Sequence, residues 1–233
     1  FLSTFFYSMG IYLVSKSITS SSIISLFICF VVIIFQKSFG SIDYPTMIFS
    51  EHTNGMMSLA IVTLIFGLVA NKNLLLAIFF SIFLICIHLT VGMWIASVLI
   101  LSLFISKFVN KNNFEIKPII YSALFAFFFV IVSFIFYYLN LVELNNKLDE
   151  SAYSTYMQVW DMHRNNFESS ILNYKYIVLS LLLIFLILFS FKYLNIKKNS
   201  SNHLMLLILF LSTSLSMIIY LAYKLLPFLF PDI

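Results

Sequence analysis

Long apolar runs separated by short polar segments are the main pattern of this chain. Six stretches contain no Asp, Glu, Lys or Arg: 23–35, 55–71, 73–106, 118–139, 176–191 and 204–223. A helix needs about 20 mostly apolar residues to cross the ~30 Å hydrocarbon core of a bilayer. The whole chain is 62% hydrophobic and only 9% charged, whereas about 25% of residues are charged in soluble domains. The pattern therefore predicts an all-α, polytopic integral membrane protein, with 1–233 as a single transmembrane helical domain.

The longest apolar stretch is too long for one crossing. It begins at Leu74 and ends at Phe108, and as one helix it would be about 52 Å long. We therefore expect a break at His88-Leu-Thr-Val-Gly92. With that break the chain contains eight candidate transmembrane segments, namely 1–15, 23–36, 55–71, 74–89, 92–108, 118–139, 176–194 and 203–225.

The connections between these eight segments alternate sides, and the charged residues sort with them. One side takes Lys16, Lys72, Lys107, Lys111, Lys117, Lys192, Lys197 and Lys198. Its single acid is Glu115, whereas the opposite side takes eight acids and five basic residues. The positive-inside rule makes the lysine-rich side cytoplasmic. The two longest connections, the outer loops 37–54 and 140–175, are then predicted to face outward from a membrane that we expect to be the bacterial inner membrane.

The chain ends and the net charge give two further expectations. Phe1 is not an initiator methionine, and the last residues, 227–233, form no polar tail, so we expect a fragment of a longer protein. The net charge of +4 comes from lysines in separate loops and not from one basic face, so the pattern predicts no nucleic-acid partner. The expected partner is the lipid bilayer.

The first candidate site lies in the outer loop 37–54. Asp43, Glu51 and His52 occur there within ten residues, and Pro45 suits the first turn of a short interfacial helix. One interpretation is that the three polar side chains line a pocket at the membrane surface. The alternative is an interfacial connector whose polar residues only face water.

The second candidate is His88, whose surroundings repeat those of His52. In each case a His and a Thr are followed by a Gly and a new apolar segment. Two such turns on one face would aim two helix N-termini, with their unpaired N–H groups, toward the outer surface, where phosphate binds readily. The alternative is a tight helical hairpin in which a backbone carbonyl satisfies His88.

The third candidate is the loop 140–175, which contains no Gly or Pro. Its aromatic and Met residues from Tyr153 to Trp160 follow helical spacing, which predicts an interfacial helix in this long outer loop. Asp161, His163 and Arg164 come at its end. Arg164 is the only arginine of the chain, and guanidinium binds phosphate or carboxylate in a bidentate manner. Alternatively, Asp161 and Arg164 only pair with each other on the helix surface.

The pattern implies no cofactor. A divalent metal would have enough ligands among the outer-side residues His52, His88, His163, Asp43, Glu51 and Asp161. However, these residues come from separate loops, and no HExxH or CxxC spacing supports a metal site.

The middles of the predicted helices contain no ionisable residue of the kind that ion-coupled transport uses. Ion-coupled transporters usually place an ionisable residue near the middle of a span, whereas the segment middles here contain only Ser, Thr, Cys and apolar residues. Aromatic residues near the predicted interfaces are expected to form a membrane-interface belt; they are Trp94, Tyr137, Tyr138, Tyr174 and Tyr176. Polar chemistry confined to the outer surface favours an enzyme that takes a lipid phosphate from the bilayer over a transporter.

The multi-span plan, the acidic outer loop 43–52 and the long loop with His163-Arg164-Asn165 resemble the polytopic bacterial envelope-glycan proteins. These are the GT-C-type glycosyltransferases and the O-antigen polymerases and ligases. The resemblance implies cell-envelope polysaccharide biosynthesis with a polyprenyl-phosphate-linked sugar. GT-C-type enzymes carry an acidic residue in the first outer loop, a role that the resemblance gives to Asp43 or Glu51.

Two functions remain open on the sequence alone. The first is a membrane-embedded glycosyltransferase or polymerase, with Asp43 or Glu51 as catalytic base. The residues expected to bind its lipid-linked sugar or phosphate substrate are His52, His88, Asp161, His163 and Arg164. The second is a non-enzymatic polytopic membrane protein, either a transporter component or a structural subunit, whose outer polar residues only contact water.

Overall fold

The computed structural model describes residues 2–35, 54–109, 114–143, 174–193 and 200–229. Within these ranges the chain forms eight α-helices, one short 3-10 segment and no strand. In chain order the elements are α1 (Leu2–Thr19), α2 (Ser22–Ile34), α4 (Asn54–Ala70), α5 (Leu74–Phe83), η1 (Leu84–Cys86, the 3-10 segment), α6 (Leu89–Phe108), α7 (Ile116–Glu143), α10 (Tyr174–Tyr193) and α11 (Ser201–Leu229). The prediction of an all-α fold is confirmed for the described residues.

Four helices are long and apolar enough to cross a membrane, as expected of an integral membrane protein. They are Leu89–Phe108, Ile116–Leu139, Tyr176–Tyr193 and Ser201–Ala222. Three other apolar helices are shorter: Ser22–Ile34, Gly55–Ala70 and Leu74–Cys86. At 1.5 Å per residue the last is only about 20 Å long, less than the ~30 Å hydrocarbon core. A topology with eight spans therefore stays a prediction.

Two glycines allow α1 and α4 to cross closely and in parallel. A Cβ on Gly10 would lie 2.5 Å from the carbonyl carbon of Thr63, and one on Gly67 would lie 2.8 Å from the Cβ of Leu13. Small residues at a helix crossing permit such backbone approach in membranes. Further along both helices, the side-chain amide of Asn71 donates to the carbonyl of Leu13 at 2.7 Å. The helices therefore run in the same direction and end side by side.

The turn from α4 to α5 is a Schellman motif. The N–H of Asn73 donates to the carbonyl of Leu68 at 2.9 Å, and that of Lys72 donates to the carbonyl of Val69 at 3.0 Å. Lys72 takes the left-handed conformation that this motif requires, with φ 63°. Asn73 then directly precedes α5, so α5 runs back along α4.

Helices α5 and α7 run parallel, because their contacts advance together along both. The hydroxyl of Ser122 donates to the carbonyl of Leu75 at 2.7 Å. The rings of Phe79 and Phe125 are 5.8 Å apart, and those of Phe83 and Phe129 are 5.9 Å apart. Each pair is separated by 46 or 47 residues, so the two helices start at the same end of the bundle.

Helix α6 must therefore run in the opposite direction to α5 and α7. It connects the end of α5 to the beginning of α7, where the ammonium of Lys107 donates to the carbonyl of Phe114 at 2.9 Å. The predicted break in the 35-residue stretch is confirmed, although α6 begins at Leu89 and not after Gly92. The chain reverses direction at His88.

The lysines of these helices gather at one end of the bundle, which we call the lysine end. Here α1, α4 and α6 finish and α5 and α7 begin, bringing together Lys16, Lys72, Lys107 and Lys117. The opposite end, where α5 meets α6, is called the His88 end. This distribution is the one expected from alternating segments, while the side of the membrane that each end faces stays a prediction.

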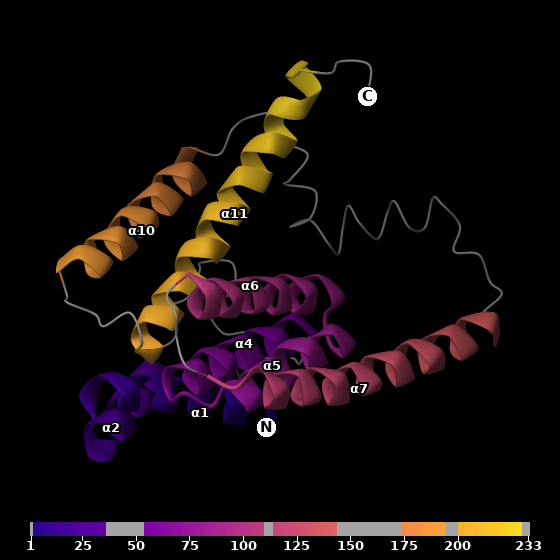
Figure 1. The fold of residues 1–233 in the computed structure, drawn as a ribbon, viewed down its shortest axis with the longest axis horizontal. Coiled ribbons are helices and arrows are strands. Elements are labelled where there is room, and N and C mark those ends of the chain that lie inside the picture. The colour runs from indigo at the N-terminus through magenta and orange to yellow at the C-terminus, as the bar shows by residue number, and fades with distance from the viewer. Residues whose placement is uncertain (1, 36–53, 110–113, 144–173, 194–199, 230–233) are drawn as a thin grey trace.

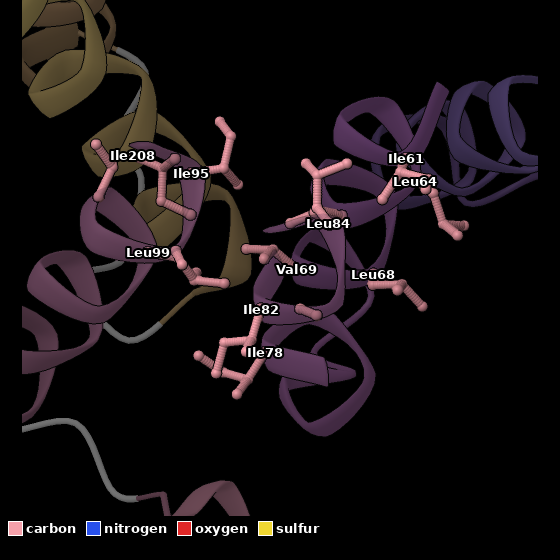
Figure 2. Packing of buried hydrophobic residues seen from close by; sticks show 14 of the residues in the cluster. Ile61, Leu64, Leu68, Val69, Ile78, Ile82, Leu84, Ile95, Leu99 and Ile208 are labelled. Carbon is pink, nitrogen blue, oxygen red and sulfur yellow. The ribbon is translucent and has the colours of Figure 1, made fainter. Parts of the chain in front are cut away.

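Helices α10 and α11 form an antiparallel pair inclined to the other helices (Figure 1). The rings of Phe191 and His203 are 5.0 Å apart near one end of the pair, and those of Tyr176 and Tyr220 are 4.8 Å apart near the other. Helix α11 joins the N-terminal helices through α6 and α4. Figure 2 shows Ile95 of α6 beside Ile208 of α11.

The buried core is apolar, and its polar members are small. It includes Val69, Ile78, Leu84 and Leu99, each 1% exposed or less. Every buried polar side chain among the described residues is a serine. In contrast, large apolar side chains cover the outside of α2, α7 and α10, which suits helices that face lipid and not water.

Candidate functional site

Of the seven residues predicted to form the site, the structure describes His88. The other six, Asp43, Glu51, His52, Asp161, His163 and Arg164, lie outside the described residues, as does the interfacial helix predicted within the loop 140–175. The ends of that loop are helical, because α7 continues to Glu143 and α10 begins at Tyr174. The site is therefore built around His88.

His88 occupies the sharp turn between η1 and α6. Its backbone is extended, with φ −149° and ψ 99°. Its N–H donates to the carbonyl of Leu84 at 2.9 Å, and its own carbonyl accepts from the N–H of Gly92 at 2.8 Å. The backbone of His88 is thus held on both sides, while its half-buried imidazole makes no hydrogen bond to a described residue.

Gly92 explains why the turn is so tight. A Cβ there would overlap the backbone N of Ile85 and would lie 2.6 Å from its Cα and 2.7 Å from the carbonyl carbon of Leu84. Only glycine permits the first turn of α6 to lie directly against η1. Sequence analysis placed Gly92 at the break itself, whereas the structure places it inside the new helix.

The beginning of α6 is a positive electrostatic site. The first N–H groups of any helix have no intrahelical partner, and the side chain of His88 does not cap those of α6. No acidic residue lies in the first turn of α6. The helix dipole adds about half a positive charge at this position. The site can therefore bind negatively charged groups that accept hydrogen bonds.

This helix start is recessed below the end of α7. Near the turn, the side chains of Cys86 and Ser133 interact, so the two residues lie at the same height in the bundle. The apolar part of α7 continues to Leu139, six residues or about 9 Å further. If that apolar part spans a bilayer, His88 lies within one leaflet and not at its surface, unlike the outer-surface position that sequence analysis expected.

An apolar groove opens beside the recess, between the start of α6 and the projecting half of α7. Its floor contains Ile85 and Val130, and its walls include Met93 of α6 and Phe134 and Tyr138 of α7. The groove has a volume of about 560 Å³. The sequence contains one signal for this groove. Few residues separate Asn73 from His88, whereas the apolar run of α7 is much longer.

No protein-family model matches this chain. Searches of curated proteins and of solved structures found no match either. Function must therefore be argued from the geometry around His88 and from the chemistry of the sequence.

Two of the aromatic residues expected in the membrane-interface belt also connect helices, and their position in the belt stays a prediction. The indole N–H of Trp94 donates to the hydroxyl of Ser212 at 3.0 Å, and the phenol of Tyr176 hydrogen-bonds the hydroxyl of Ser216. Both contacts join another helix to α11. The sequence does not reveal these contacts, because the serines of α11 resemble ordinary small residues of a span.

The arrangement at the His88 end combines two properties within one recess. An uncapped helix N-terminus and an imidazole are suited to an anion, whereas the adjoining groove is suited to hydrocarbon. Within the described residues no three His, Cys, Asp or Glu side chains lie together as metal ligands do. The metal hypothesis stays untested, because five of its six candidate ligands lie outside those residues.

Proposed function

We propose that this chain is part of a membrane-embedded glycosyltransferase or polymerase that uses a polyprenyl-phosphate-linked sugar at the outer face of a bacterial inner membrane. The observation that carries the proposal is the recessed start of α6, where His88 and uncapped N–H groups adjoin an apolar groove. A substrate that carries phosphate on a hydrocarbon chain needs both environments next to each other.

The helix interior supports an enzyme more than an ion-coupled transporter. Transporters and proton relays place ionisable groups among the buried residues of their spans. Among the described residues, serine is the only polar type that is buried. Small hydroxyls hydrogen-bonded to their own helices, such as Ser102 to Val98, stabilise packing and carry no proton across the membrane.

The reaction needs a base and a phosphate-binding group. In the proposed mechanism Asp43 or Glu51 takes the proton from an acceptor hydroxyl, whose oxygen then bonds to the anomeric carbon of the sugar. The bond from that carbon to the phosphate oxygen breaks, and the electron pair leaves with the lipid phosphate. His88, Arg164 and the start of α6 stabilise the leaving phosphate, and His52, Asp161 and His163 contact the sugar or phosphate.

Substitution of the proposed residues tests this mechanism in cells. We expect the paired change of Asp43→Ala with Glu51→Ala, and separately Arg164→Ala, to abolish glycan synthesis and to cause an undecorated lipid-linked sugar to accumulate. Lys37→Ala and Lys147→Ala, which change charges in the same two loops, are the matched controls and should have no effect. Normal glycan synthesis by both test variants, at normal protein levels in the membrane, would rule the mechanism out. Loss of a solute-uptake activity without lipid-linked sugar accumulation would instead favour the transporter alternative.

The proposed sidedness can be tested separately with single cysteines. In a background with Cys29→Ala and Cys86→Ala, an impermeant thiol reagent should modify cysteines placed at positions 52 and 163 from outside the inner membrane. A cysteine at position 113 should react only after the membrane is opened. Modification of position 113 from outside, with 52 and 163 protected, would place the candidate site on the wrong side for an outer-face enzyme.

A further inference from the structure

The groove beside His88, called the channel below, is lined by apolar side chains and is widely open on one side. Val130 at its floor is 5% exposed, while Met93 and Ile135 on its two sides are each more than half exposed. The phenol of Tyr138 carries the only polar side-chain atom among the lining residues. The channel is therefore closed on the protein side, open on the outside and suited to an elongated apolar ligand.

The length of the channel matches one leaflet of a bilayer. Its residues on α7 run from Phe127 to Leu139, a rise of about 18 Å along the helix. Half of the ~30 Å hydrocarbon core is about 15 Å. A hydrocarbon chain whose phosphate lies at the start of α6, at the level of Ser133, can thus follow the lower part of the channel toward Phe127, near the middle of the membrane.

Two segments outside the described residues are poorly suited to fill the channel. Residues 36–53 and 144–173 each contain both acidic and basic residues. Charged groups are excluded from an apolar site unless they are paired. Hydrocarbon is the medium that surrounds the channel, and the positive start of α6 at Leu89, which itself lines the channel, favours a chain that ends in a negative group.

We propose that this groove binds the part of the polyprenyl chain next to the phosphate of the lipid-linked substrate. The inference rests on the proposed function and adds to it the residues that recognise the lipid. The chain lies against Val130 and Ile135, between Met93 and Phe134, and its phosphate lies at the start of α6 beside His88. Competition by phosphatidylglycerol distinguishes a polyprenyl phosphate from a two-chain phospholipid in this groove.

Photocrosslinking of the full chain in membranes tests the proposal. The probe is a polyprenyl phosphate with a diazirine in its chain, and the crosslinked residues are located by peptide mass analysis. We expect adducts on residues 127–139 that are removed by excess polyprenyl phosphate and not by the same excess of phosphatidylglycerol. Met93→Trp places an indole in the channel. If the indole prevents only two CH₂ groups of the probe from being buried there, labelling should fall about tenfold.

Matched variants separate occupation of the channel from general damage. Ile100→Trp changes a residue on the same face of α6, two turns away from Met93. Ile100 is 52% exposed and Met93 is 55% exposed. The probe should label this variant as strongly as the unchanged protein. Ile135→Trp on the channel side of α7 and Leu124→Trp outside the channel form a second pair on α7. This second pair keeps the test decisive if Met93→Trp prevents folding.

Three results would overturn the groove assignment. They are equal labelling of Leu124 and the channel residues, equal competition by phosphatidylglycerol, and crosslinks between two copies of the chain in place of lipid adducts. Glycan synthesis measured in cells lacking the chain distinguishes this failure from failure of the proposed function. If those cells still accumulate lipid-linked sugar while the tryptophan pairs behave alike, the enzyme proposal stands and the groove proposal is wrong.

Discussion

Replacement of Gly92 by alanine should open the turn that holds His88. The added methyl would lie 2.6 Å from the Cα of Ile85 and 2.7 Å from the carbonyl carbon of Leu84, whereas ordinary contacts begin at 3.4 Å. The obstructing atoms belong to the backbone of η1, so no side-chain rotation can relieve the overlap. The backbone N of Ile85 is closer still, so we expect α6 to move away from η1 by about 1 Å.

The energetic effect of this movement follows from the packing that it disturbs. A gap of 0.5–1 Å removes a quarter to a half of the dispersion energy of each separated contact. Overpacking of this kind usually costs about 1–3 kcal/mol, and the higher helix propensity of alanine offsets up to about 1 kcal/mol. The expected net loss is about 1–2 kcal/mol, which raises the open fraction of the turn roughly five- to thirtyfold.

Two measurements can detect this change. Titration of the reconstituted protein with SDS, followed by tryptophan fluorescence, should show a lower midpoint for Gly92→Ala. In a Cys29→Ala background, Cys86 in η1 is the remaining thiol, and its modification by a membrane-permeant reagent should accelerate. Ser97→Ala, an exposed change on the same helix, should leave both values unchanged.

Equal results for Gly92→Ala and Ser97→Ala would contradict the reasoning. They would mean that α6 does not lie against η1, and the held backbone of His88 and the recess beside it would lose their structural basis. A lower midpoint without faster Cys86 modification would locate the loss of stability away from the turn.

Three further predictions concern the contacts between helices. Gly10→Ala and Gly67→Ala should each destabilise the protein by about 1–3 kcal/mol, and the double variant by less than the sum, since both separate the same crossing of α1 and α4; additive effects in the SDS titration would contradict a shared contact. Lys72→Gly should raise stability by up to about 1 kcal/mol, because glycine adopts the positive φ of this turn without strain, and an unchanged midpoint would contradict that conformation. A double-mutant cycle of Trp94→Phe with Ser212→Ala should give a coupling of about 0.6 kcal/mol for their hydrogen bond, whereas zero coupling would show that α11 is not held there.

The helix boundaries were predictable because charge and length constrain them independently. Each predicted segment overlaps one described helix, and most ends agree within a few residues. The break near His88 followed from the length of the apolar stretch from Leu74 to Phe108, since about 52 Å is too long for one crossing. The register of the helices was not predictable, because the glycine crossing of α1 with α4 depends on residues more than 50 positions apart.

The candidate site was predictable only in part. His88 was found from the length of the apolar stretch and from the likeness of its surroundings to those of His52. Its depth depends on the pairing of α5 with α7, which local patterns do not contain. The hydrogen bonds of Trp94 and Tyr176 to α11 were not predictable for the same reason: an aromatic residue near the end of a span can also reach a hydroxyl on another helix, and only tertiary packing shows whether it does.

The recess at the His88 end follows from a mismatch in length between neighbours. Together α5 and η1 contain 13 residues, about 20 Å, and the parallel helix α7 continues past them because its start is fixed by the contact of Ser122 with Leu75. Lengthening α5 would raise the start of α6 toward the end of α7 and close the recess, whereas lengthening α7 would deepen it. A span that is shorter than its membrane is normally unfavourable, because it thins the bilayer or leaves polar groups in hydrocarbon. In the proposed topology the short α5–η1 segment places an uncapped helix start beside the apolar groove, and from this position the phosphate of the proposed lipid substrate can be reached within the membrane.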